Sequence, residues 1–490
     1  MNSHKNAVVA LRIGKSACSF LLLWAATLCV APAQTFTVLA SLNGTNGNEP
    51  YLGSVVQGFD GNFYGTTLFG GTHNNSMCDD LGCGVVFSMT PGGTVTVIYN
   101  FCAHTNCTDG AAPEAGLVQA TDGNLYGTTT AGGAHGKGTI FRISPAGKMR
   151  VLYSFCAQTN CADGENARGT LVQGSNGSFY GTTYGGGSSL NGTVFKVTSH
   201  GVLSTLYSFT GGADGASPDT GLVQATDGNL YGTTSVFGGG NGGTVFKITL
   251  LGALTTLYSF CVQASCPDGA NPEAALIQGN DGNLYGTTWI GGASGADGGG
   301  TIFKITRSGA LTTLYSLGSS DGARSTAALV QATDGNFYGT TSTGPSGAGT
   351  IFEITPSKVF TTLYTFCSQS NCADGQTPYA GLMQATDGSL YGTNLGSLAS
   401  YGIIYSLDLG LGPFVEALPA SGKVGASVTI LGNQLSGATS VTFNGTAASF
   451  TVVSDTEITT TVPTGATSGT VEVTTPSGTL ASNGRFRVKP

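Results

Sequence analysis

The sequence predicts an all-β protein: a seven-bladed β-propeller followed by a small β-sandwich. Three observations lead to this prediction. A motif centred on Tyr-Gly recurs seven times, each full repeat contains four strand-like segments, and the last repeat lacks a segment whose type stands alone near the N-terminus. Repeats of about fifty residues with four strands each are typical of propeller blades.

The first 33 residues have the layout of a secretory signal. Lys5, Arg12 and Lys15 precede an apolar run over residues 17–30, and Ala31 and Ala33 match the small residues before a signal-peptidase site. The run is short for a membrane span. We therefore expect cleavage near Ala33 and a secreted or cell-surface protein with no transmembrane segment in the mature chain.

Composition limits the classes of partner. Without the three cations of the signal, 15 basic residues remain against 26 acidic ones, a net charge of −11. This charge argues against nucleic acid and anionic membranes as partners. Only 9% of the residues are charged and 79 are glycine, while apolar residues remain plentiful, which indicates a turn-rich β protein. We expect it to be a monomer.

The tyrosine of the Tyr-Gly pair marks each repeat. Successive copies are 51 to 62 residues apart, at Tyr64, Tyr126, Tyr180, Tyr231, Tyr285, Tyr338 and Tyr391. In the second copy, apolar runs predict strands over residues 115–120, 125–129, 138–144 and 149–155. Asp122-Gly123 predicts a tight hairpin between the first two strands, because glycine tolerates the positive φ that such a turn needs.

The seventh copy predicts how the propeller closes. It has a third strand at residues 401–407 but no fourth, and the segment Thr35–Leu42 matches the fourth strand Leu311–Leu317 of an earlier copy. We expect the N-terminal strand to complete the last blade, so that the propeller spans residues 34–410.

The quoted residues resemble a known family. The pattern "GLVQATDGNLYGTT…GTIFKIT…LTTLYSF" resembles the GloVer (Gloeo_Verruco) tandem repeat of bacterial exported proteins over residues 35–410. The resemblance implies an exported propeller without an established activity.

The tail, residues 411–490, resembles an immunoglobulin-like IPT/TIG domain. The pieces that carry this resemblance are "SGKVGASVTILGNQL", "VTFNGTAASF", "SDTEITTTVP" and "GTVEVTTPSG". Alternating strands with turns every eight to twelve residues are also what a small sandwich requires. Such modules in bacterial surface proteins act as spacers or as binding units, and both roles stay open.

Ten cysteines of the mature chain form five pairs at one spacing. An even number at regular spacing in an exported protein predicts disulfides. Metal binding is the rival interpretation, but zinc usually needs four ligands and successive pairs are expected a blade apart. The predicted bonds are Cys78–Cys83, Cys102–Cys107, Cys156–Cys161, Cys261–Cys266 and Cys367–Cys372.

The residue before each "AGL" segment differs among the copies, whereas the sequence around it is similar in all of them. These residues enter the innermost strands, so we expect them to line the rim of the central channel, on the face that carries the longer loops. Acidic, basic and aromatic side chains there could hold a sugar or a cation; the alternative is an unconstrained solvated rim. The positions are Tyr51, Glu114, Arg168, Asp219, Glu273, Thr326 and Tyr379.

Two other sets of residues have simpler interpretations. The Asp of each loop Asp-Gly pair could suggest calcium, but one carboxylate per loop is more simply a turn former. These are Asp109, Asp163, Asp214, Asp268, Asp321 and Asp374. His73, His104 and His135, near Asp79 and Asp80, could form a metal or catalytic cluster, although loop histidines are more often plain surface residues.

We therefore predict a non-enzymatic recognition or structural module with an extracellular glycan or protein ligand and no catalytic, metal or cofactor residues. The sequence contains no nucleophile elbow and no HExxH motif. The alternative is a metal-assisted lyase or hydrolase on the long-loop face, which would need the three histidines.

Overall fold

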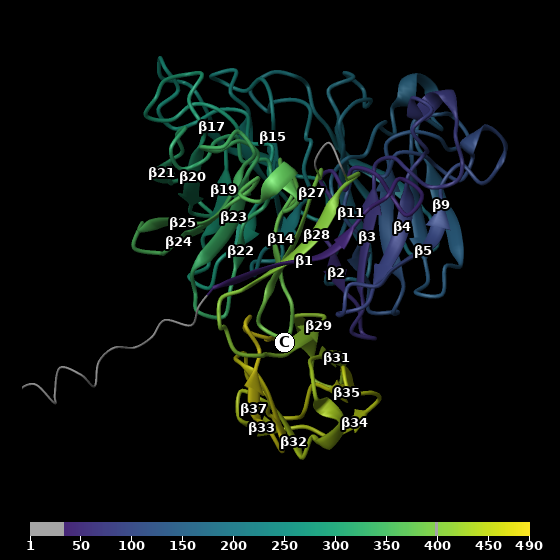
Figure 1. The fold of residues 1–490 in the computed structure, drawn as a ribbon, viewed down its shortest axis with the longest axis vertical. Coiled ribbons are helices and arrows are strands. Elements are labelled where there is room, and N and C mark those ends of the chain that lie inside the picture. The colour runs from purple at the N-terminus through teal and green to yellow at the C-terminus, as the bar shows by residue number, and fades with distance from the viewer. Residues whose placement is uncertain (1–33, 397–399) are drawn as a thin grey trace, which may run out of the picture.

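The computed structural model describes residues 34–396 and 400–490, so the predicted signal lies outside the described residues. Seven four-stranded antiparallel sheets cover residues 35–408 in a propeller-like repeat fold. Six of these sheets take four consecutive strands, and the seventh combines the first strand of the chain with the last three of the array. Figure 1 shows the sheets side by side, with the C-terminal part beneath them.

The strands of the six consecutive sheets have these bounds: β2 (Val56–Gln57), β3 (Phe63–Thr67), β4 (Val85–Met89), β5 (Val95–Asn100); β6 (Val118–Gln119), β7 (Leu125–Thr129), β8 (Thr139–Ile143), β9 (Met149–Ser154); β10 (Val172–Gln173), β11 (Phe179–Thr183), β12 (Thr193–Val197), β13 (Leu203–Ser208); β14 (Val223–Gln224), β15 (Leu230–Thr234), β16 (Thr244–Ile248), β17 (Leu254–Ser259); β18 (Ile277–Gln278), β19 (Leu284–Thr287), β20 (Thr301–Ile305), β21 (Leu311–Ser316); β22 (Val330–Gln331), β23 (Phe337–Thr341), β24 (Thr350–Ile354), β25 (Phe360–Thr365). The seventh contains β26 (Met383–Gln384), β27 (Leu390–Asn394), β28 (Ile403–Asp408) and β1 (Thr35–Ser41). Short 3-10 helices are η2 (Ser76–Cys78), η3 (Thr105–Cys107), η4 (Thr159–Cys161), η5 (Ser370–Cys372) and η6 (Leu435–Gly437).

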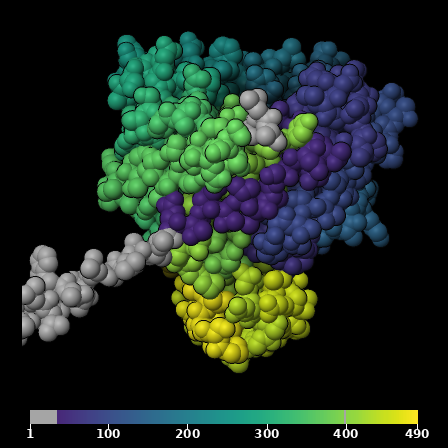
Figure 2. All heavy atoms as spheres, viewed as in Figure 1, coloured from purple at the N-terminus to yellow at the C-terminus, as the bar shows by residue number. Residues whose placement is uncertain are grey.

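The predicted completion of the last sheet by the N-terminal strand is present. Strand β1 pairs antiparallel with β28, from Thr35 opposite Asp408 to Ser41 opposite Ile403. The ring of Phe36 stacks on Tyr364 in the sixth sheet, with centroids 3.9 Å apart. In Figure 2 this strand runs across the molecule between the early and late parts of the array.

The repeated "YGTT" segment builds the second strand of each sheet and ties it to its surroundings. In the second sheet, the Tyr126 hydroxyl donates to Asp122 at 2.8 Å within the predicted hairpin, where Gly123 has a φ of +79°. Gly127 faces the Phe141 ring across the ladder, where a Cβ atom would come within 2.6 Å of that ring. Thr129 bonds Thr139 at the start of the third strand, at 2.9 Å. The motif therefore specifies packing and hydrogen bonds within the sheet.

The first strands are shorter than predicted. The expected strand over residues 115–120 contributes only Val118 and Gln119 to the ladder of its sheet. The preceding residues bond the neighbouring sheet instead: Thr66 donates its hydroxyl to the Ala115 carbonyl at 2.7 Å, and Leu52 N–H donates to the Glu114 carbonyl at 3.2 Å. The carbonyl groups of Glu114 and Ala115 bond the neighbouring sheet, so they do not extend the hydrogen-bond ladder of their own sheet.

Neighbouring sheets pack through stacked aromatic rings. Tyr126 lies 4.0 Å from the Phe179 ring of the next sheet, and Phe63 of the first sheet lies 4.3 Å from Tyr391 of the last. One buried cluster also joins the first and last sheets, with Phe87, Tyr391 and Ile404 among its members. Aromatic pairs at these distances add about 0.5–1.5 kcal/mol beyond the area they bury.

The long loops gather at one end of the array. Single bridges join the loops that enter the second to sixth sheets to the loop between the second and third strands of the sheet entered, as at Ala111 with Ala131 and Glu165 with Gly185. The tight hairpins, such as Asp122-Gly123, lie at the opposite end. The expected division into a long-loop face and a hairpin face is therefore present.

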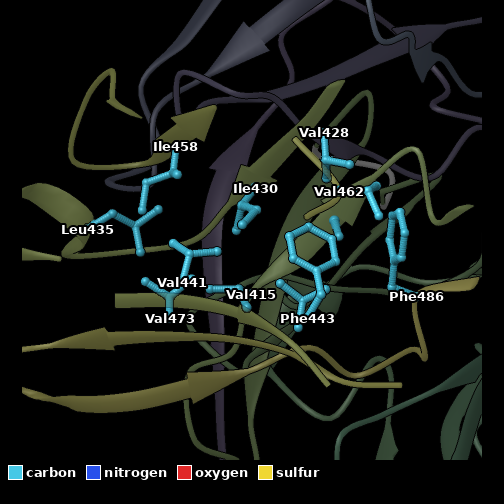
Figure 3. Packing of buried hydrophobic residues seen from close by; sticks show 12 residues of the cluster. Val415, Val428, Ile430, Leu435, Val441, Phe443, Ile458, Val462, Val473 and Phe486 are labelled. Atoms are coloured by element: carbon cyan, nitrogen blue, oxygen red, sulfur yellow. The ribbon is translucent and has the colours of Figure 1, made fainter. Parts of the chain in front are cut away.

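The C-terminal part forms two sheets packed face to face. Its strands are β29 (Glu416–Leu418), β30 (Ser421–Lys423), β31 (Ser427–Leu431), β32 (Ser440–Phe443), β33 (Thr446–Ala447), β34 (Phe450–Val452), β35 (Glu457–Thr461), β36 (Val471–Thr475), β37 (Gly478–Ala481) and β38 (Arg487–Lys489). The sheets β29-β31-β35-β34 and β33-β32-β36-β37 share an apolar core, and β30 pairs with β38. Figure 3 shows Ile430, Val441 and Phe443 within this core.

This C-terminal part lies against the hairpin face of the array. The Thr456 hydroxyl donates to the Phe59 carbonyl at 2.7 Å, and the Asn433 amide donates to the Thr386 hydroxyl at 2.8 Å. On another side, the Asn483 amide donates to the Gln331 carbonyl at 2.9 Å. These bonds reach the first, seventh and sixth sheets, so the C-terminal part is seated on the hairpin end of the array.

Among the described residues, no helix has the length and apolar character needed to cross a membrane.

Candidate functional site

Cavities follow the axis of the array, lined by the first strands of the sheets. A narrow cavity of about 110 Å³ is lined by Leu52, Arg168, Asp219, Glu273 and Leu382, among others. It shares Glu273 and Thr326 with a cavity of about 220 Å³ beside the long loops, and Ser54 and Leu382 with one of about 450 Å³ beside the C-terminal part. We call the opening at the long-loop end, where the seven predicted rim residues lie, the channel mouth.

One half of the channel mouth is an ion-pair network centred on Arg168. Its Nε lies 3.6 Å from Glu114 Oε2, and its Nη1 lies 3.5 Å from Asp219 Oδ1. The three side chains come from the second, third and fourth sheets, and the guanidinium also lies over the Tyr184 ring, 4.3 Å from its centroid. The cation is thus held between two carboxylates and an aromatic face.

Burial shifts the acid–base properties of this network. It raises the pKa of Asp219 and of Glu114, and the charge of Arg168 opposes the shift in both. For Arg168, burial lowers the pKa, but the charges of Glu114 and Asp219 outweigh it and the net shift is upward. Arg168 therefore keeps its charge, and it is the group that stabilises the two neighbouring carboxylates.

The other half of the channel mouth is aromatic. Tyr51 and Tyr379 face each other with ring centroids 4.9 Å apart at an interplanar angle of 50°. Together with Trp289, Arg324 and Glu273 they line the cavity of about 220 Å³. The Arg324 guanidinium lies 5.2 Å from the Trp289 centroid. This combination offers flat apolar faces beside hydrogen-bonding and charged groups.

Glu273 lies between the two halves. It has no ion-pair or hydrogen-bond partner among the described residues. Burial raises its pKa to about 7, the charge of Asp219 adds to the shift, and Arg168 opposes it. Burial, followed by the charges of Tyr379, Glu114, Asp219 and Glu273, also raises the pKa of Tyr51 to about 12. Near neutral pH the Glu273 carboxyl can accept or donate a hydrogen bond.

The structure thus brings the predicted rim residues to one opening, with a division that the sequence did not indicate. Thr326 also lines the cavity, and its hydroxyl donates to the Tyr379 carbonyl at 3.1 Å. Sequence reasoning missed Trp289 as a member of the site. A second comparison among repeats contains the signal: Trp289 follows the repeated "YGTT" segment, a position where the other copies carry Leu68, Thr130, Tyr184, Ser235, Ser342 and Leu395.

The three loop histidines do not form a cluster. His73 Nδ1 lies 3.2 Å from the Phe101 carbonyl oxygen, and His104 and His135 are exposed. Among the described residues, the one group of three or more His, Cys, Asp or Glu side chains close enough to share a metal ion is Cys83, Cys102 and Cys107. The geometry therefore does not support the alternative of a histidine-based lyase or hydrolase.

The predicted disulfide pairing is confirmed at all five pairs. One argument used against metal binding is wrong, however. The bonds Cys78–Cys83 and Cys102–Cys107 are neighbours rather than a blade apart, because the loop between β3 and β4 lies beside the loop that leaves β5. It is their pairing into disulfides that occupies these sulfurs.

The loop aspartates are turn formers. In the loop after β9, Asp163 is fully buried and accepts hydrogen bonds from the Tyr153 hydroxyl at 2.8 Å and from the backbone N–H groups of Ala157 and Gln158 at 3.0 Å each. The same bond from the fourth-strand tyrosine recurs at Asp109, Asp214, Asp268, Asp321 and Asp374. In each of these loops at least one aspartate oxygen is therefore engaged in shaping the loop, as the simpler interpretation expected; Asp268 Oδ1 is buried without a partner among the described residues.

Fold and site together define an all-β, disulfide-bonded repeat protein with a propeller-like array and an axial opening. The chain belongs to the Gloeobacter/Verrucomicrobia repeat family, whose profile matches residues 27–226, 76–296, 212–405 and 262–456. No curated protein matches the chain.

Solved structures share the fold at low sequence identity. One is a fungal alcohol oxidase of the AA5 family in complex with copper, at 12% identity and a TM-score of 0.50, over 90% of this chain and 98% of that one. Another is the extracellular domain of a putative one-component system from B. thetaiotaomicron, at 13% identity and a TM-score of 0.50, over 94% of this chain. The chain spans 58% of the length of that sensor domain. These similarities concern the fold alone.

Proposed function

We propose that the chain is an exported recognition protein that binds a glycan at the channel mouth. In this proposal, residues 34–410 form a closed seven-bladed β-propeller and residues 411–490 form an IPT/TIG-like immunoglobulin domain. The stacking of Phe63 on Tyr391 supports closure, because it joins the first and last sheets in the way that Tyr126 and Phe179 join internal ones. The two face-to-face sheets of the C-terminal part support the immunoglobulin-like assignment.

Export to the cell surface or the medium is supported by the disulfides. Five disulfides within one chain indicate folding in an oxidising compartment. The predicted signal at residues 1–33 and the low share of charged side chains agree with this location. We propose that the protein acts there as a monomer without a catalytic cofactor.

The aromatic half of the channel mouth carries the glycan proposal. Tyr51, Trp289 and Tyr379 are half-buried and converge on one small concavity, together with Glu273 and Arg324. Sugar rings present apolar C–H faces and a rim of hydroxyl groups. Aromatic faces match the first, and a carboxyl beside a guanidinium matches the second. A protein ligand would need a larger contact surface than a cavity of about 220 Å³ provides.

The tryptophan of the site supplies its own test. The sequence contains two tryptophans, Trp24 in the predicted signal and Trp289 at the channel mouth, so tryptophan fluorescence of a chain starting at residue 34 reports on Trp289 alone. We expect at least one oligosaccharide of a panel to change this fluorescence in a saturable manner. Tyr51→Ala and Tyr379→Ala should each weaken that binding about tenfold, as truncation of a central aromatic contact does.

A matched control is Tyr401→Ala, which removes an exposed tyrosine that does not line the cavity and should leave the affinity unchanged. Binding that survives both rim substitutions unaltered would place the glycan elsewhere. A full panel without any saturable fluorescence change would refute glycan recognition at the channel mouth.

A further inference from the structure

A further cavity, separate from the three described above, lies between the hairpin face and the C-terminal part. It has a volume of about 390 Å³. The array contributes Gln173, Ser175, Gln224 and Thr226 from hairpins of the third and fourth sheets and their first strands. The C-terminal part contributes residues 419–421 and three cations. We call this cavity the basic cleft.

Two cations of the basic cleft, Arg487 and Lys489, come from β38, and Arg485 lies two residues before this strand. Arg485, Arg487 and Lys489 alternate along the chain with Phe486 and Val488, and Phe486 is buried in the core between the two C-terminal sheets. Alternation places the three cations on the opposite side of the strand. A charged outer face is an ordinary way to protect an edge strand, but here that face lines a cleft against the array instead of open solvent.

Among the described residues, no acidic side chain forms an ion pair with these cations. In the described part of the chain, the ion pairs involve Lys137, Arg168 and Arg307, and none involves Arg485, Arg487, Lys489 or Lys423. Lys423 lies directly beside Lys489 in the parallel pairing of β30 with β38, where like charges are destabilising. Burial, then the charges of Arg487 and Lys423, lower the pKa of Lys489. Arg485 Nη2 donates to the Ser468 carbonyl at 3.3 Å and Lys489 Nζ donates to the Ser175 carbonyl at 3.4 Å, but neutral carbonyls leave the positive charge of the cluster uncompensated.

A neutral donor in the basic cleft is also free. In five of the other six sheets the glutamine of the first strand donates its side-chain amide to a glycine carbonyl of the hairpin, as Gln224 does to Gly228 at 3.0 Å and Gln278 to Gly282 at 3.0 Å; Gln57 of the first sheet is the exception. Gln173 accepts the corresponding bond from Thr121 N–H at 3.1 Å, but its Nε2 has no partner among the described residues. It lines the cleft opposite the cations.

We propose that the basic cleft binds a tetrahedral oxyanion, a phosphate or sulfate group on a small molecule. Arg487 and Lys489 supply charge-assisted hydrogen bonds, Arg485 adds its charge, and Gln173 donates its free amide from the array side. The anion relieves the repulsion among the cations and bonds both parts of the chain at once. A long polyanion is disfavoured, because the acidic chain as a whole repels it.

The test is calorimetric titration of residues 34–490 with sodium phosphate and, separately, sodium sulfate at low ionic strength, with sodium chloride as the monovalent reference. We expect one saturable site for at least one dianion and none for chloride; a preference between the two identifies the natural group as a phosphate or a sulfate ester. Arg487→Gln should weaken binding at least tenfold and Gln173→Ala several-fold. Added salt should weaken it further.

Two controls keep the result interpretable. Lys247→Gln removes a cation of β16 that does not line the cleft and should leave the affinity unchanged. Gln173→Ala alters the array and leaves β38 intact, so a misfolded C-terminal strand cannot explain its effect. The proposal is overturned if neither dianion binds saturably, or if both substitutions bind like the unsubstituted chain. Glycan binding at the channel mouth is read separately, through Trp289 at the other end of the channel.

Discussion

The Thr386 backbone N–H donates to Gln57 Oε1 at 2.9 Å, which joins the last sheet to the first across 329 residues of sequence. An equivalent bond connects each of the other six pairs of consecutive sheets. In each case a backbone N–H in the first hairpin of one sheet donates to the glutamine of the next, at Phe59–Gln119, Thr121–Gln173, Ser175–Gln224, Thr226–Gln278, Asn280–Gln331 and Thr333–Gln384. The contact between the ends of the array is thus equivalent to the contacts within it.

This equivalence predicts the effect of removing the glutamine at the junction. Gln57→Ala should lower the free energy of unfolding by about 1–3 kcal/mol, the cost of leaving a buried N–H group without its acceptor. Gln119→Ala, which removes the equivalent buried bond between the first and second sheets, should cost about as much. Urea unfolding followed by circular dichroism compares the two. A negligible effect at Gln57 beside a clear one at Gln119 would mean that the array is open at this junction.

The N-terminal strand should contribute strongly to stability, because it supplies the outer strand of the seventh sheet. Phe36→Ala removes the ring that stacks on Tyr364 and lies 5.2 Å from Tyr405. We expect a loss of about 3 kcal/mol, since Phe-to-Ala changes at packed positions cost about 3–5 kcal/mol and Phe36 is only partly buried. Val202→Ala, at an exposed hairpin residue, is the control.

Removal of the whole strand is the stronger version of this test. A chain that starts at Asn43 leaves the edge of β28 unpaired and the Tyr364 ring uncovered, so its thermal unfolding should lose cooperativity. A melting curve like that of the chain from residue 34 would show that β1 does not lock the array.

The buried loop aspartates should matter more for loop structure than the disulfides beside them. Asp163→Ala removes the acceptor of the Tyr153 hydroxyl and of two backbone N–H groups, and we expect a loss of about 3 kcal/mol. Replacing Cys156 and Cys161 together by serine reopens a short loop, which costs roughly 2 kcal/mol in the chain-entropy account.

The fourth sheet shows why this order is expected. Its entry loop has no cysteine, yet Asp214 still accepts the bonds of Tyr207 and Thr210. Thermal unfolding of the Asp163→Ala variant and of the double-cysteine variant tests this order, and we expect the Asp163→Ala variant to unfold at the lower temperature. A double-cysteine variant that unfolds first would assign the loop shape to the disulfide instead.

Much of this architecture could be predicted from the sequence, because it is repeated. Seven tyrosines fixed the number of sheets, and the unmatched segment Thr35–Leu42 indicated its partner. The length of the first strands was mispredicted, since the carbonyl of Ala115 is satisfied by Thr66 of another sheet, a contact that no periodicity encodes. Seating of the C-terminal part depends on isolated bonds such as Thr456 to Phe59, between segments 397 residues apart.

The candidate site was predictable only in part. Comparison of repeats located Arg168 and Glu273, because they occupy one position in different copies. The split into an ion-pair half and an aromatic half arises from which side chains happen to be neighbours around the opening. Trp289 belongs to a different position of the repeat, so a comparison confined to the "AGL" position could not find it.

Glu273 should make stability depend on pH at the channel mouth. Its pKa is about 7 in the folded chain against an ordinary value of 4.5, so the folded state binds more protons than the unfolded state between these values. The contribution of this carboxyl to the free energy of unfolding therefore falls as the pH rises from about 4.5 to about 7 and is constant outside that window.

Glu273→Gln removes this decline. Between pH 5 and pH 8, the free energy of unfolding of the variant should rise by on the order of 2 kcal/mol relative to that of the unsubstituted chain, as measured by urea unfolding at both pH values. Glu472→Gln, on the exposed face of β36, controls for the loss of a surface carboxylate. If the free energies of unfolding of Glu273→Gln and the unsubstituted chain differ by the same amount at pH 5 and pH 8, Glu273 is ionised in the folded protein throughout this range. Its carboxylate is then better solvated than its position between Asp219 and Tyr51 implies.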